Sequence, residues 1–189
     1  MKATCINGSA SKNGSCAILI EAIAQGIIES SGEVVKYCAG DMDLHFCKGC
    51  KKCYADGICV QSDDVQKVVK DMLTSDFVVI VAPSYWAGVP AQLKALIDRT
   101  TPYGNTNPNR ILKAEKPIKG IAVAVRAGVR EQENALILDA IEHYFGHLGI
   151  EIIKRVSVIR TDTPEDLTMK NRDKIEELYL LGKSLREII

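Results

Sequence analysis

The sequence predicts an α/β protein built on a doubly wound parallel sheet with helices on both faces. Strand-length apolar segments alternate with helix-length segments along the 189 residues. Residues 77–82 (FVVIVA) are apolar throughout and mostly β-branched, which is typical of a parallel strand covered on both faces. Strands joined through helices need crossover connections, which are right-handed and lead to parallel pairing.

The first half of the chain supplies three predicted strands and two predicted helices. The strands are expected at residues 3–6, 33–37 and 77–82, and the helices at residues 15–29 and 65–73. The first helix is bounded by Ser15 and by Ser30-Ser31-Gly32, which are residue types common at helix ends.

The second half adds two strands and three helices. The strands are expected at residues 118–125 and 151–158, and the helices at residues 91–99, 131–148 and 165–188. Pro90 suits the first turn of the helix that follows it. Five strands in this arrangement suggest the flavodoxin-like order 2-1-3-4-5. We expect residues 1–189 to form a single domain with two irregular stretches, at about 38–62 and at 100–115.

The composition excludes several classes of function. Apolar residues make up 47% and charged residues 25% of the chain, and Lys+Arg equals Asp+Glu at 24 each. This balance gives no electrostatic reason to expect nucleic acid or a membrane as partner. The longest apolar runs are far shorter than the roughly 20 residues that span a bilayer. The N-terminal residues contain no long apolar run, so we expect a cytoplasmic protein, in which structural disulfides are rare.

The loop after the first strand, NGSASKNGS (residues 7–15), resembles an anion-binding loop. Its hydroxyls precede a helix N-terminus, where free N–H groups and the helix dipole favour an anion. Its glycine spacing fits neither an ATPase P-loop nor a Rossmann dinucleotide loop. The loop suits one phosphomonoester, such as that of FMN, although a polar turn with a good cap accounts for the same residues. The candidate contacts are Ser9, Ser11, Asn13, Gly14, Ser15 and Cys16.

The loop after the third strand, APSYWAGVP (residues 82–90), holds two adjacent aromatic residues, including the only Trp of the chain. Aromatic side chains at the carboxyl end of a strand suggest a wall for a flat ring, with nearby backbone at its polar edge. An aromatic plug over the sheet edge is the alternative. The candidate ring contacts are Pro83, Ser84, Tyr85, Trp86, Ala87 and Gly88.

The loop after the fourth strand (residues 126–131) is the third candidate. Ala127 and Gly128 could close the other side of the ring. Either Arg126 or Arg130 could stabilise negative charge on a reduced flavin.

Four of the seven cysteines lie within thirteen positions, spaced C-x2-C-x2-C-x5-C: Cys47, Cys50, Cys53 and Cys59. A cysteine cluster in a cytosolic protein is more often metal-binding or catalytic than disulfide-bonded. Consecutive x2 steps resemble the runs of bacterial ferredoxins that bind four-iron clusters, whereas zinc commonly takes two separated C-x2-C pairs. Zinc and free thiols stay open as alternatives. Lys48, Lys51 and Lys52 would offset the negative charge of a thiolate-ligated cluster.

The segments NGSASKNGS, CKGCKKCYADGICVQSDD, APSYW and AQLKALIDR, in this order, resemble the iron–sulfur flavoproteins of anaerobic microbes, a branch of the NADPH-dependent FMN reductase group. The resemblance covers roughly residues 1–160. It implies FMN on the three loops and a [4Fe-4S] cluster on the four cysteines of the run. The phosphate loop departs from relatives at Ala10 and Ser11, where a Pro and an Arg are common.

The resemblance also implies a function and partners. It implies an FMN-dependent oxidoreductase that passes electrons between a low-potential, ferredoxin-like carrier or NAD(P)H and an acceptor. It further implies a homo-oligomer, either a dimer or a tetramer, with each cluster near the partner's flavin. The alternatives are an NAD(P)H-dependent FMN or quinone reductase without a cluster, and a zinc-clipped flavodoxin-like binding module.

Overall fold

A computed structural model describes residues 1–188 and confirms the predicted fold. Five parallel strands form one sheet in the order β2-β1-β3-β4-β5. Their bounds are β1 Lys2–Asn7, β2 Glu33–Cys38, β3 Phe77–Pro83, β4 Ile118–Val125 and β5 Ile150–Val158. This is the flavodoxin-like order that the alternation of segments suggested.

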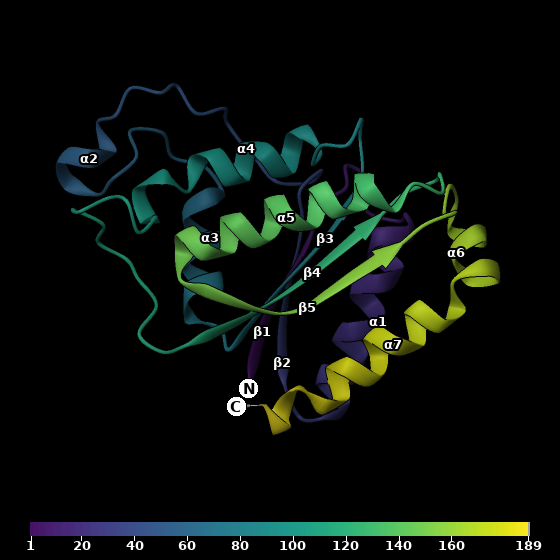
Figure 1. Ribbon diagram of the computed structural model, residues 1–189. Helices are drawn as coiled ribbons and strands as arrows, with labels where there is room; N and C mark the ends of the chain where they lie inside the picture. The colour runs from purple at the N-terminus through teal and green to yellow at the C-terminus, as the bar shows by residue number, and fades with distance from the viewer. Residues whose placement is uncertain (189) are drawn as a thin grey trace.

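Helices cover both faces of the sheet (Figure 1). One face carries α3 (Val65–Thr74), α4 (Ala91–Arg99) and α5 (Glu131–Leu148). The other face carries α1 (Ser15–Glu29), α6 (Pro164–Lys170) and α7 (Arg172–Ser184). A single turn, α2 (Cys53–Asp56), and two short 3₁₀ helices, Thr101–Tyr103 and Leu185–Glu187, complete the elements.

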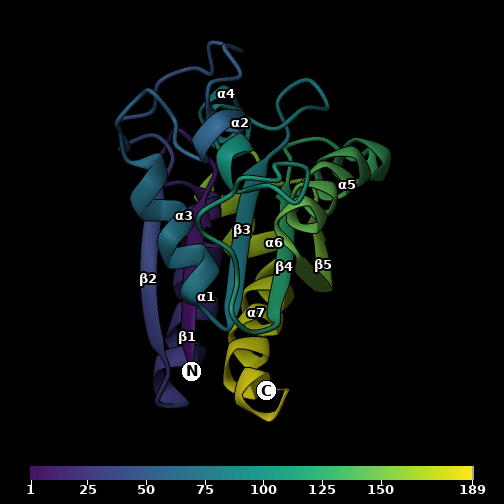
Figure 2. The ribbon, with the colours of Figure 1, turned by 90° about the vertical axis from the view of Figure 1, so that its left-hand side faces the viewer.

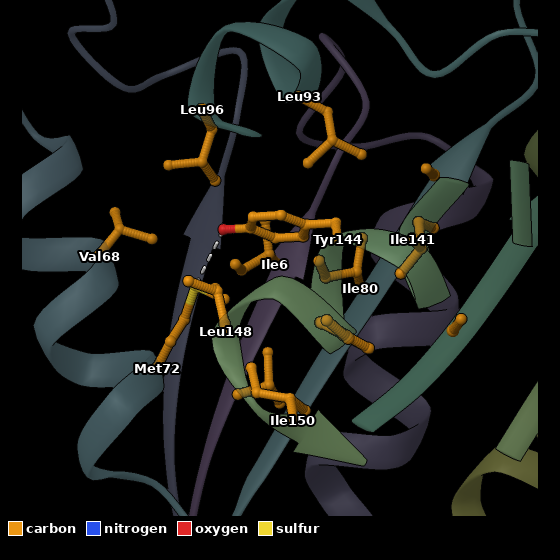
Figure 3. Close-up of a cluster of buried hydrophobic side chains, with 14 of the residues drawn as sticks. Ile6, Val68, Met72, Ile80, Leu93, Leu96, Ile141, Tyr144, Leu148 and Ile150 are labelled. Atoms are coloured by element: carbon orange, nitrogen blue, oxygen red, sulfur yellow. Dashed lines mark hydrogen bonds between the residues drawn. The ribbon is translucent and has the colours of Figure 1, made fainter. Parts of the chain in front are cut away.

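The sheet separates two apolar cores, because successive strand residues point to opposite faces. In β3, Val78 and Ile80 belong to the core under α3, α4 and α5, whereas Val79 and Val81 belong to the core under α1 and α7. Figure 3 shows the first core around Tyr144, whose hydroxyl hydrogen-bonds Met72 Sδ at 3.9 Å. Both faces of the central strand are therefore buried, as its apolar sequence predicted.

The predicted C-terminal helix is broken, so the expectation of one continuous helix over residues 165–188 was wrong. A capping box of Thr163 and Asp166 starts α6, and the helix ends at Asn171. The Asn171 amide donates to the Ile159 carbonyl at 2.9 Å and to Thr161 Oγ1 at 2.8 Å. Asn side chains often hydrogen-bond nearby backbone in place of helix hydrogen bonds, and α7 restarts after this residue.

The carboxyl ends of all five strands lie at one edge of the sheet, and the predicted site residues follow them. The register pairs Asn7 at the end of β1 with Cys38 of β2 and Val81 of β3. Figure 2 shows α2 and the long loops beyond this edge, with both chain termini at the opposite edge. In the described part of the chain, no helix is long and apolar enough to cross a membrane.

Candidate functional site

The buried side chain of Asn7 organises the loop after β1. Its Oδ1 accepts a hydrogen bond from the Ser9 amide at 3.0 Å, and its Nδ2 donates to the Ser11 carbonyl at 3.0 Å. Ser9 Oγ in turn accepts from the Ser11 amide at 3.1 Å. These bonds shape the loop through its own polar side chains, as Asn and Ser commonly do in turns.

The N-terminus of α1 has no capping side chain and no acidic residue in its first turn. The first N–H groups of a helix have no partner within the helix, so this end offers free donors together with the positive end of the dipole. Cys16 is buried in the core of the α1 face. Burial raises the pKa of its thiol to about 12.

The loop after β3 forms a tight hairpin. Tyr85 and Gly88 exchange two backbone hydrogen bonds of 3.0 Å, and the two residues between them both have positive φ, 54° for Trp86 and 58° for Ala87. Non-glycine residues rarely adopt this conformation, and such strain concentrates at functional sites. Trp86 is fully exposed and Tyr85 is half exposed. The aromatic side chains thus stand at the sheet edge and do not plug it.

One polar atom of this loop is buried without a partner. Ser84 Oγ has no hydrogen-bond partner within the described chain, although its backbone amide donates to the Val125 carbonyl at 2.8 Å. A buried, unsatisfied hydroxyl is costly, so it points to a group that the chain itself does not supply.

In the loop after β4, the Arg126 side chain is bonded to residues close to it in the sequence. It forms an ion pair with Glu133 at 2.8 Å and donates to the Arg130 carbonyl at 2.9 Å. Arg130 is exposed at 3.9 Å from the same carboxylate. Ala127 is exposed, and the Gly128 carbonyl accepts from the Arg160 amide. The Arg126 charge is thus already compensated by Glu133.

Hydrogen bonds between its two ends close the cysteine loop. The Asp43 amide donates to Asp64 Oδ2 at 2.8 Å, and the Asp64 amide donates to the Asp43 carbonyl at 3.1 Å. Farther along, the Gln61 side chain donates to the Phe46 carbonyl at 3.0 Å. We call these paired segments, residues 43–46 and 61–64, the stem of the cysteine loop.

Above the stem, all four predicted thiols line one cavity of about 220 Å³. Cys47 and Cys50 are exposed, and Cys53 and Cys59 are half-buried; all seven cysteines of the chain are free. The Gly49 amide donates to Cys47 Sγ at 3.5 Å. Burial and the nearby Cys59 raise the pKa of the Cys53 thiol, with smaller contributions from Cys50 and Cys47.

As they lie in the structure, the four thiols are not arranged to coordinate a metal ion. Among residues 1–188, no three His, Cys, Asp or Glu side chains come together in a way that could hold a metal ion.

Residues of the second irregular stretch, 100–115, hydrogen-bond the backbone of the cysteine loop. The buried Asn107 donates to the carbonyls of Cys53 at 3.0 Å and Pro102 at 3.1 Å, and Asn109 donates to the Tyr54 carbonyl at 2.6 Å. Gly57 ends α2 with φ 77°, and a Cβ on it would lie 2.2 Å from the Asn109 carbonyl. The two stretches, predicted as separate irregular loops, thus form one structure that includes a helical turn and a 3₁₀ turn.

Arg99 is buried, so the interpretation of Lys94, Asp98 and Arg99 as a solvated helix face, with Asp98 and Arg99 anchoring the following loop, was wrong about the exposure of Arg99. Arg99 lines the thiol cavity and is 1% exposed, whereas the lysines predicted to balance the cluster's charge, Lys48, Lys51 and Lys52, are exposed. A signal was present in the sequence. Arg99 follows Leu93 and Leu96 at three-residue spacing and so shares the apolar face of its helix.

The predicted flavin contacts lie apart from the cavities that adjoin the cysteine loop and β2. They line neither the thiol cavity nor two larger ones, of about 590 Å³ between α4 and α5 and about 390 Å³ beside β2. Cys47 and Tyr54 line the 590 Å³ cavity as well, so the thiols adjoin it.

Comparison with known proteins gives relatives of two kinds. An iron-sulfur flavoprotein of Archaeoglobus fulgidus is 35% identical over 133 residues, which is 70% of this chain and 58% of that protein. An FMN-dependent NADH:quinone oxidoreductase of Bradyrhizobium is 40% identical over 100 residues, or 47% of this chain and 48% of that protein. The chain thus spans about half the length of the curated relatives it matches.

Among solved structures, an NAD(P)H:quinone oxidoreductase from Methanothermobacter marburgensis has the same fold. Its TM-score is 0.76 at 15% identity, covering 98% of this chain and 97% of that one. Residues 1–160 match the NADPH-dependent FMN reductase family. This match takes in the three strand-end loops and the cysteine loop, and the chain belongs to the NADPH-dependent FMN reductase family.

Proposed function

We propose that residues 1–189 act as one FMN-binding domain carrying a [4Fe-4S] cluster, a redox flavoprotein that passes electrons between a low-potential carrier and an acceptor. A ferredoxin-like protein or NAD(P)H is the proposed donor. Bound FMN exchanges one or two electrons and a cluster exchanges one, so the pair would couple carriers of different electron number.

The observation that carries the proposal is the common cavity of the four thiols. Cys47, Cys50, Cys53 and Cys59 come from one loop whose ends are tied together and whose turn is supported by Asn107. The cavity also has a buried cation in its wall, which suits a negatively charged thiolate cluster. The name of the Archaeoglobus relative supports the same assignment.

The loops after β1 and β3 fit the two ends of FMN. The uncapped N-terminus of α1, with Ser9, Ser11, Asn13, Gly14 and Ser15 around it, would hold the phosphate. Ser84 Oγ, buried without a partner, is available to a polar atom of the ring, and the exposed Tyr85 and Trp86 are available to its face. Pro83, Ala87, Gly88, Ala127 and Gly128 would complete the contacts, and the Cys16 amide would join the phosphate site.

We also infer a homo-oligomer, a dimer or a tetramer. Large apolar side chains stand exposed on the loops near the cysteines and the flavin site: Phe46, Ile58, Val60, Trp86 and Ile111. Exposed apolar side chains in such number favour burial against another protein surface.

A matched pair of cysteine variants tests the proposal. Cys50→Ser removes a thiol of the cavity, and Cys38→Ser removes a thiol outside the loop. After anaerobic reconstitution we expect Cys50→Ser to lose most of its iron and to keep FMN, and Cys38→Ser to keep its iron. Equal iron in the two variants would refute the cluster assignment.

The second candidate function is an NAD(P)H-dependent FMN or quinone reductase without a cluster. The described thiols form no ready-made metal site, and the Bradyrhizobium relative is named as an NADH:quinone oxidoreductase. This candidate predicts quinone reduction by NAD(P)H at the same rate in Cys50→Ser and in the unmodified chain. A third candidate, a zinc-clipped binding module, predicts one zinc per subunit and no bound flavin.

A further inference from the structure

Arg99 donates hydrogen bonds to both segments of the stem. Its Nη1 donates to the His45 carbonyl at 3.0 Å, and its Nη2 donates to the Gln61 carbonyl at 3.3 Å. Both nitrogens also bond the carboxylate of Asp63, and Asp63 accepts from the His45 amide at 3.0 Å. One guanidinium on α4 therefore contacts each end of the loop that carries the thiols.

Arg99 is the member of its ion pair that borders the thiol cavity. Asp63, its buried partner, is not among the residues that line the cavity. Arg99 Nε is buried and has no partner in the described chain. A buried cation with a free donor favours negative charge beside it.

We propose that Arg99 is a positioning residue of the cysteine site, which fixes both ends of the cysteine loop and places the positive end of a buried ion pair beside the thiols. The second part rests on the proposed function, because it concerns a cluster held by those thiols. A cluster would gain negative charge on reduction, and the positive end of the Arg99–Asp63 pair would stabilise that form, although Asp63 offsets part of the effect. The exposed lysines of the loop are screened by water and contribute less.

Two substitutions separate the two roles. Arg99→Lys keeps the charge but loses the planar fork that reaches both carbonyls. The double variant Arg99→Gln with Asp63→Asn replaces the ion pair by two neutral side chains and leaves no buried carboxylate unpaired. Arg155→Gln is the control, because Arg155 lies on β5 and pairs with Asp139 and Glu142, away from the loop.

The first measurement is hydrogen–deuterium exchange of residues 46–61 in the full chain without iron. We expect exchange at least about tenfold faster in both Arg99 variants, the factor for losing one hydrogen bond to a charged group, and no change in Arg155→Gln. Unchanged exchange in both Arg99 variants would overturn the positioning role. This measurement needs no cluster, so it decides that role even if the chain binds no iron.

The second measurement is the reduction potential of the reconstituted cluster. We expect the double variant to be harder to reduce by up to about tenfold in the equilibrium constant, or up to about 59 mV for one electron, because it removes both charges of the pair, and Arg99→Lys to stay near the unmodified chain. A potential in the double variant equal to that of the unmodified chain would overturn the role of the charge. Absence of iron in the unmodified chain would instead overturn the proposed function.

Discussion

The side-chain amide of Asn107 is hydrogen-bonded to the backbone carbonyl of Cys53 at 3.0 Å, 54 positions earlier in the sequence. The same amide donates to the Pro102 carbonyl at 3.1 Å, and Asn107 is almost fully buried. A single side chain thus connects the turn that carries the third cysteine to the stretch after α4.

Substitution of Asn107 by Ala should weaken this connection. Because buried carbonyls would lose their donor, we expect the free energy of unfolding to fall by about 1–3 kcal/mol in urea titrations. Asn105→Ala is the control, since its amide makes an exposed bond to the Gly146 carbonyl, and should cost less than about 1 kcal/mol. Equal losses in the two variants would contradict a special role for Asn107.

The cysteines should divide by reactivity. Burial raises the pKa of the Cys5 and Cys16 thiols to about 12, so both stay protonated at pH 8, whereas Cys47 and Cys50 are exposed. Without a cluster, iodoacetamide at pH 8 should label Cys47 and Cys50 first and spare Cys5 and Cys16 until urea is added. Mass spectrometry of the labelled peptides shows which cysteines have reacted. Native labelling of Cys16 as fast as that of Cys47 would show that its thiol is accessible.

Ser84→Ala should not lower the stability of the flavin-free chain but should weaken its binding of flavin. Its hydroxyl is buried without a partner, so its removal should leave the free energy of unfolding unchanged or slightly higher. If the hydroxyl bonds the flavin, the dissociation constant for FMN should rise about tenfold in a fluorescence titration. A large loss of stability with unchanged FMN affinity would contradict the assignment of this atom.

Stability should decline in acid because of carboxylates such as Asp71. Burial raises the pKa of Asp71, but hydrogen bonds from Tyr37 at 2.5 Å and Lys2 at 2.9 Å outweigh it and leave the pKa lowered. A lowered folded pKa stabilises the protein fully above the ordinary Asp value of about 3.9, and this contribution is lost as the pH falls through the folded value.

The check is the urea midpoint measured from pH 7 to pH 2.5. We expect a drop below about pH 4 that is shallower in Asp71→Asn, because that variant has no proton to gain at this position. An identical pH profile in the variant would mean that Asp71 does not contribute.

Local sequence signals were enough for the sheet and most helices. The apolar run of β3 and the helix signals at Ser15 and Pro90 depend on neighbouring residues, and the structure has elements at those places. The break at Asn171 was missed because it depends on bonds to Ile159 and Thr161, in a loop whose path the sequence does not reveal.

The cysteines of the site could be predicted from the sequence, but the residues that contact their loop could not. The spacing of the cysteines marked the loop, and all four thiols line one cavity. The roles of Asn107 and Arg99 depend on contacts across 54 and 36 positions, which no local pattern encodes. The lysines of the loop were predicted to balance the cluster's charge because they are next to the cysteines in the sequence. The buried cation is instead Arg99, on α4.

Counting iron, acid-labile sulfide and FMN per subunit after anaerobic purification and reconstitution tests the central claim most directly. The claim is that the four thiols of this one loop hold a four-iron cluster beside a flavin site. It predicts about four irons, about four sulfides and one FMN per subunit. Less than about one iron per subunit, or one zinc in its place, would contradict it.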